Sequence, residues 1–113
     1  MLEGFATPEG TTNFARKSLV HNENFRKIHD LTLSNVGIGT YLGNPDLETD
    51  MQQKNAIKQS ISQGVNVIDT AINYRAQKSE RTVGKAVSEL IEEGQINRSE
   101  IFVSTKNGYV TND

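Results

Sequence analysis

Short apolar runs alternate with longer amphipathic stretches along most of the chain. Three runs, at residues 36–39, 65–69 and 101–104, are typical of buried strands. Between them, apolar residues recur every three or four positions, which favours two helices. The faces that turn toward the sheet would be Ala56, Ile57, Ser60 and Ile61 in the first helix, and Val83, Val87, Leu90 and Ile91 in the second. This order of elements predicts a parallel sheet with right-handed crossovers.

Polar residues and glycines indicate where the two helices begin and end. Thr49 or Asp50 is expected to cap the first helix and Ser79 the second, because such side chains accept hydrogen bonds from free N–H groups. Gly64 and Gly94 follow the helices, at positions where a left-handed residue commonly ends a helix.

The first third of the chain lacks this rhythm. Residues 1–13 are rich in Gly, Thr, Pro and Asn without any period, which indicates a flexible lead-in. From Phe14 to Leu33 apolar and polar residues alternate weakly around a polar break at residues 21–24, which predicts a short β-hairpin. The expected organisation is a lead-in followed by one α/β domain over residues 14–113.

The composition excludes several classes of protein. A length of 113 residues suits one domain, and a net charge of −2 offers no basic stripe for nucleic acid. No apolar run approaches the roughly 20 residues that cross a bilayer, and the N-terminus lacks signal-peptide features. The absence of cysteine fits a reducing compartment and excludes thiolate metal sites. We therefore expect a cytoplasmic protein without a metal, a nucleic-acid partner or a membrane partner.

Three side chains suited to proton chemistry lie near the predicted strand ends. Asp69 ends the second strand, Lys106 follows the third, and active sites of parallel α/β folds assemble at these ends. Tyr74 lies in the loop after Asp69. A phenol, with a pKa of about 10, is a weak acid, and a nearby ammonium favours its anion. Each residue alone is typical of a turn or surface position, but together they predict a general acid for a carbonyl oxygen.

The ordered motifs resemble the aldo-keto reductase family from about Leu33 to Gly108. Four segments carry the resemblance: VGIGTY at 36–41, VIDTA at 67–71 with Tyr74, the stretch from Ser79 to Ala86, and EIFVSTK at 100–106. The resemblance implies a (β/α)8 TIM barrel preceded by a β-hairpin that closes its bottom. It also implies reversible reduction of aldehydes and ketones to alcohols, usually with NADP(H).

The same resemblance assigns roles to individual residues. Tyr74 would be the proton donor, and Asp69 and Lys106 would tune it. The residues near the cofactor would be Gly39, Thr40, Tyr41, Asp69 and Lys106. Two departures bear on the substrate: Arg75 stands where the family often has Gly, and Tyr41 where it often has Trp.

The length predicts an incomplete barrel, truncated after its third strand. A full barrel takes about 250 residues, and the family's catalytic histidine ends a fourth strand. His21 and His29 both precede the first strand and cannot replace it. We therefore expect an isolated chain that is inactive and that self-associates through open strand edges.

Two other functions fit parts of the pattern. The chain could be a non-catalytic interaction or regulatory subunit. Alternatively, Gly37, Gly39 and Gly43 with Asp69 resemble a Rossmann-type dinucleotide site, whose glycine turn runs straight into a helix. Here residues 44–46 (NPD) intervene before helical spacing starts, which disfavours the Rossmann interpretation.

Overall fold

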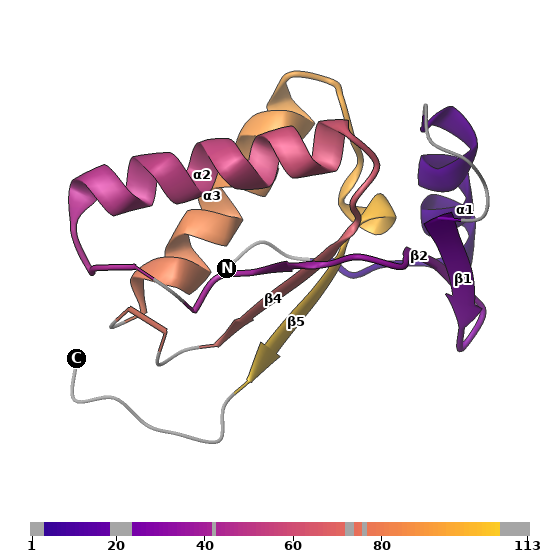
Figure 1. Ribbon diagram of the computed structural model, residues 1–113. Coiled ribbons are helices and arrows are strands. Elements are labelled where there is room, and N and C mark those ends of the chain that lie inside the picture. The colour runs from indigo at the N-terminus through magenta and orange to yellow at the C-terminus, as the bar shows by residue number, and fades with distance from the viewer. Residues whose placement is uncertain (1–3, 19–23, 42, 72–73, 76, 107–113) are drawn as a thin grey trace.

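The computed structural model describes residues 4–18, 24–41, 43–71, 74–75 and 77–106. It has a mixed α/β architecture with two small sheets (Figure 1). The elements in chain order are α1 (Pro8–Lys17), β1 (Phe25–Ile28), β2 (Leu31–Ser34), β3 (Ile38–Gly39), α2 (Leu47–Ser62), β4 (Val67–Ala71), α3 (Lys78–Glu92), the 3-10 helix η2 (Arg98–Glu100) and β5 (Phe102–Lys106).

The second sheet confirms the predicted parallel pairing. Its strands lie in the order β3-β4-β5, so each strand pairs with the next one in the chain. Helices α2 and α3 are the crossovers, and both cover the same face of this sheet (Figure 1). The opposite face carries no helix among the described residues, and its side chains at Val67, Asp69 and Phe102 are only half-buried.

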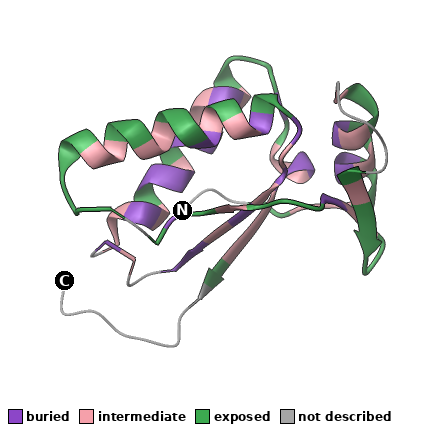
Figure 2. Cartoon of the chain, in the orientation of Figure 1, coloured by how far each residue is buried: buried purple, intermediate pink, exposed green. Residues whose placement is uncertain are grey.

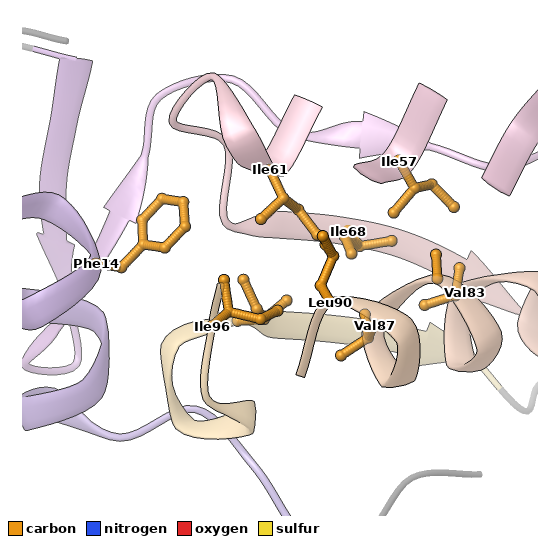
Figure 3. Packing of buried hydrophobic residues seen from close by; sticks show 10 residues of the cluster. Phe14, Ile57, Ile61, Ile68, Val83, Val87, Leu90 and Ile96 are labelled. Carbon is orange, nitrogen blue, oxygen red and sulfur yellow. The ribbon is translucent and has the colours of Figure 1, made fainter. Parts of the chain in front are cut away.

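The hydrophobic core lies between the two helices and the covered face of the sheet (Figure 3). The apolar stripes predicted for the helices supply most of it, although Ala56 points to solvent and Ile91 only borders the cluster. Figure 2 shows the same asymmetry as buried stripes on the inner sides of both helices. The buried cluster consists of Phe14, Ile57, Ile61, Ile68, Val83, Ala86, Val87, Leu90, Ile96 and Ile101.

The N-terminal region differs from the predicted lead-in. Residues 8–13 belong to helix α1, so the expectation of irregular structure there is wrong. Thr7 caps this helix by accepting a hydrogen bond from the N–H of Gly10 (2.9 Å), and Pro8 occupies the first turn, where its missing N–H costs nothing. Phe14 anchors the helix in the core. A Cβ at Gly10 would lie 2.3 Å from the carbonyl oxygen of Ser99, so glycine permits the close approach of α1 to η2.

The predicted hairpin is confirmed, in a shorter form. Strands β1 and β2 pair antiparallel, with Phe25 opposite Ser34, whereas residues 14–17 are helical. The hairpin and α1 lie at the end of the molecule where β4 and β5 begin (Figure 1). Most of the predicted polar break falls on residues 19–23, outside the described parts of the chain.

A buried asparagine joins the hairpin to the parallel sheet. The Asn66 side chain is fully buried, and its oxygen accepts from the N–H of Ser34 (2.8 Å). Its amide nitrogen donates to the carbonyl oxygens of Thr32 (3.0 Å) and Glu100 (3.3 Å). The Glu100 carboxylate is also fully buried and pairs with Lys17 of α1 at 2.8 Å. These polar contacts fix α1, the hairpin, η2 and the residue before β4 against one another.

Several predicted boundaries are corrected. Helix α2 begins at Leu47, because Asp46, and not Thr49 or Asp50, accepts the capping hydrogen bond. Ser79 lies inside α3, which starts after Gln77 in the left-handed conformation without a side-chain cap. The helix ends are as predicted, since Gly64 (φ 103°) and Gly94 (φ 76°) are both left-handed.

The first parallel strand is not buried as predicted. Val36 is 67% exposed, and β3 contains only Ile38 and Gly39. This strand lies at the edge of the sheet, so one of its sides has no neighbouring strand among the described residues.

Candidate active site

The strand register places the predicted site residues Gly39, Asp69 and Lys106 close together in the sheet. Asp69 pairs with Gly39 of β3 on one side and with Ser104 of β5 on the other. The prediction that Asp69 ends its strand is wrong, because β4 continues to Ala71. Ala71 pairs with Lys106 at the end of β5. Lys106 thus lies two residues beyond the level of Asp69. Its side chain is outside the described parts, so the ion pair between them stays a prediction.

Two backbone hydrogen bonds hold Tyr74, which lies three positions after the last residue of β4. Its N–H donates to the carbonyl oxygen of Ala71 (3.2 Å), and its own carbonyl accepts from the N–H of Ser79 (3.4 Å). The Tyr74 ring contacts the Tyr41 ring edge-on, with the centroids 5.0 Å apart and the planes at 82°. The structure therefore brings together the predicted proton donor and one predicted cofactor residue, which come from different loops.

Thr40 links β3 to β4. Its N–H and its hydroxyl both donate to the carbonyl oxygen of Asp69, at 3.1 and 2.9 Å. Its own carbonyl accepts from the hydroxyl of Ser79 and from the amide of Gln53. The side chain is fully buried, so its hydroxyl contacts the backbone of Asp69 and not solvent.

The space beside Asp69 is open. A Cβ built on Gly39 would meet no atom within 4 Å, and Gly39 pairs with Asp69 across the sheet. Paired residues of parallel strands share one face, so this space lies on the Asp69 side. Tyr41 follows at 65% exposure. A flat aromatic ring of a ligand could lie against this edge of the sheet, over Gly39 and beside Asp69 and Tyr41. The residues present therefore fit the nicotinamide end of a dinucleotide.

Arg75 has a structural role that the sequence did not reveal. Its side chain is 1% exposed and contacts the start of α2, so any effect of Arg75 on the choice of substrate does not come from direct exposure. The guanidinium donates to the carbonyl of Asn44 (2.9 Å), to the Gln53 side chain (3.0 Å) and to the Asp50 carboxylate. Arg75 also has φ of +51°, a conformation that glycine adopts without strain. No local pattern signals this contact, because Asp50 and Arg75 belong to different elements.

Comparison with known proteins identifies the family of the chain. Residues 35–112 match the model of the aldo/keto reductase family, which covers more than half of the chain. The chain belongs to the aldo/keto reductase family. Its match to the family includes the strands that carry Asp69 and Lys106 and the turn that carries Tyr74.

Three curated members of the family are similar to the chain. The NADH-specific methylglyoxal reductase of Escherichia coli is 35% identical over 86 residues, which are 72% of this chain and 24% of that protein. Aldose reductase C of Dictyostelium discoideum is 28% identical over 94 residues, 83% of this chain and 27% of that protein. The NAD(P)H-dependent 6'-deoxychalcone synthase of Glycine max is 35% identical over 71 residues, 63% of this chain and 21% of that protein. The chain spans about a quarter of the length of these aldo/keto reductases.

Other site types gain no support. The Rossmann interpretation fails because α2 begins only at Leu47, after a cap at Asp46, so the glycines do not open a helix. Within the described ranges, no three acidic or histidine side chains gather into a metal-binding group. Over the same ranges, no helix combines the length and apolar character needed to cross a membrane.

Proposed function

We propose that this aldo/keto reductase chain supplies the proton-donating part of a carbonyl reductase site. Tyr74 donates a proton to the carbonyl oxygen of an aldehyde or ketone. The Lys106 ammonium stabilises the phenolate that is left, and the Asp69 carboxylate keeps that ammonium charged and oriented. The observation that carries the proposal is the register of β4 and β5, with Asp69 and Lys106 on adjacent strands and Tyr74 in the turn that follows Ala71.

The nicotinamide end of the cofactor would be held beside Gly39, Thr40, Tyr41, Asp69 and Lys106. When bound, NAD(P)H supplies the hydride. The chain's own contribution is positional: Gly39 leaves room, Thr40 holds the backbone of Asp69 through two hydrogen bonds, and the exposed Tyr41 ring supports Tyr74. The names of the similar proteins include both NADH and NAD(P)H, so we propose the nicotinamide class, with NADP(H) as the family's usual member.

We further propose that the chain forms the first strands and helices of a TIM barrel in the cytoplasm. The remaining strands would pair at the open edges of β3 and β5, and the bare sheet face would line the barrel interior. Without them the described part of the chain leaves the sheet face uncovered, and we expect the isolated chain to be catalytically inactive and prone to self-association.

Two assays test the proposal. The first mixes the isolated chain with NADPH or NADH and a panel of aldehydes and ketones, and follows absorbance at the nicotinamide band. The second replaces the matching segment of the Escherichia coli methylglyoxal reductase with this chain. In that chimera we expect turnover, with kcat reduced about 100- to 10,000-fold by Tyr74→Phe.

A matched control comes from the neighbouring ring. Tyr41→Phe removes a hydroxyl from the same aromatic pair and should leave kcat within about threefold, because the edge contact needs only the ring. Equal losses in Tyr41→Phe and Tyr74→Phe would refute the assignment of the proton donor. Turnover by the isolated chain that disappears in Tyr74→Phe would refute the proposed inactivity.

A further inference from the structure

A groove lies between the N-terminal halves of α2 and α3, apart from the bare sheet face. Its volume is about 330 Å³. On the α2 side it exposes Leu47 and Met51, which are 79% and 64% accessible, respectively, and lie one helical turn apart. Adjoining apolar side chains that are exposed and rimmed by polar residues mark interaction sites more often than single exposed ones do.

The α3 side of the groove is basic. Lys78, Arg81 and Lys85 line it at spacings of three and four residues, which puts them on one face of the helix. They span about 10 Å along the axis, at 1.5 Å per residue. No salt bridge to any of the three occurs among the residues that the structure describes. Three positive charges in a row are therefore available to a partner.

The other charges of the groove are already paired. Lys54 closes one end of the groove and bonds to Glu89 of α3 at 2.9 Å. Asp50 is the one carboxylate among the described lining residues, and it pairs with the buried guanidinium of Arg75. Because Asp50 is already neutralised, it does not offset the row on α3. The groove has an apolar wall and a positive wall.

We propose that this groove binds an acidic amphipathic helix of a partner protein. Its apolar side chains would contact Leu47 and Met51, and its carboxylates would meet the basic row on α3. The chemistry favours a helix over a small anionic amphiphile for two reasons. The charges are distributed over about two helical turns, which suits several carboxylates better than one head group. The apolar wall is open to solvent, so it cannot enclose an alkyl tail, whereas methionine adapts well to a helix surface.

The site lies on the outer helices and does not involve Asp69, Tyr74 or Lys106. Its test is therefore independent of the proposed reductase chemistry. The probe is a synthetic 18-residue helix with leucines on one face and glutamates on the adjacent face, labelled with fluorescein and titrated with the 113-residue chain. We expect a Kd below about 100 µM at low salt, with affinity that falls as ionic strength rises. A peptide of the same composition with the two faces scrambled should bind at least about tenfold more weakly.

Charge reversal on the protein locates the site. Arg81→Glu with Lys85→Glu should raise Kd about tenfold or more, while Arg26→Glu with Lys27→Glu changes the net charge equally on exposed residues of β1 and should leave Kd unchanged. A peptide with lysines in place of glutamates should bind the α3 double variant better than it binds the original chain. This exchange keeps the test valid if either variant alters the fold.

Three results would overturn the proposal. One is equal binding of the ordered and scrambled peptides, and another is an equal loss in the α3 and β1 double variants. The third is saturable binding of dodecanoate in the groove without any binding of the acidic helix, which would assign the groove to a small amphiphile.

Discussion

Replacement of Arg75 tests whether its buried side chain holds the turn that carries Tyr74. The guanidinium contacts Asn44, Asp46, Gln53 and Asp50 through four hydrogen bonds. It therefore ties the turn after β4 to the loop before α2 and to α2 itself. Arg75→Ala removes all four bonds and keeps the left-handed backbone. Arg75→Gly removes the same bonds and relieves the strain at φ of +51°.

The expected loss follows from the environment of these bonds. All four bonds have the charged guanidinium as donor and contribute about 2 kcal/mol each, which gives a gross loss of roughly 8 kcal/mol. Much of this loss is offset, because the variant no longer buries a charge. Asp50 keeps 26% of its side-chain surface exposed, so it is rehydrated in the variant and part of the loss is recovered. We expect Arg75→Ala to lower the free energy of unfolding by about 2–3 kcal/mol. Arg75→Gly should be less damaging by about 1 kcal/mol.

The assay is urea unfolding followed by far-UV circular dichroism, since the chain has no tryptophan for fluorescence. Near-UV dichroism reports the Tyr41–Tyr74 contact, and we expect its signal to weaken in Arg75→Ala before unfolding begins. A double-mutant cycle with Asp50→Asn should give a coupling energy of about 1–2 kcal/mol. Arg16→Ala, at an exposed position of α1, is the matched control and should change the free energy of unfolding by no more than about 0.5 kcal/mol. Equal destabilisation by Arg75→Ala and Arg16→Ala would refute the buried role of Arg75.

Three further variants test the polar groups of the fold by urea unfolding. Asn66→Ala breaks three hydrogen bonds of a buried side chain and should lower the free energy of unfolding by about 3 kcal/mol. Asn55→Ala, at an exposed position of α2, should leave it unchanged, and equal effects of the two variants would contradict the role of Asn66. Thr70→Val removes a buried hydroxyl for which the described residues supply no hydrogen-bond partner, and it should stabilise the chain by about 1 kcal/mol. Destabilisation would indicate a partner elsewhere in the chain. The hydroxyl and the backbone N–H of Thr49 lower the pKa of Asp46 below its usual 3.8, so its contribution is complete above that value and is lost as the pH falls through the folded pKa. Asp46→Asn should weaken this acid dependence, and an unchanged pH profile would exclude the cap as its source.

The elements that the sequence predicted correctly are those with strong local signals. The parallel strands and both covering helices follow from apolar periodicity, and their ends at Gly64 and Gly94 follow from the need for a left-handed residue. The pattern also predicted that Asp69 and Lys106 lie on adjacent strands, because consecutive strands of a parallel sheet bring their carboxyl ends to the same edge.

The features that escaped prediction depend on distant contacts. Helix α1 is rich in Thr, Asn and Gly, which are poor helix formers, and it is stabilised by Phe14 in the core and by the approach of Gly10 to Ser99. The role of Arg75 depends on Asp50, which lies 25 positions away in the chain. The two-residue shift between Asp69 and Lys106 depends on a register that the pattern of either strand alone does not contain.

The order of the strands also bears on how the chain folds during synthesis. Each strand of the parallel sheet pairs with its immediate successor, and all members of the hydrophobic cluster lie between Phe14 and Ile101. Each crossover therefore docks onto a strand made just before it, and the pairing of Ile38 with Ile68 and of Val67 with Phe102 closes one crossover at a time. The emerging polypeptide can bury its isoleucines and valines one unit at a time at the ribosome exit, before β5 is completed. Vectorial assembly of this kind limits how long a bare strand edge is exposed to other nascent chains.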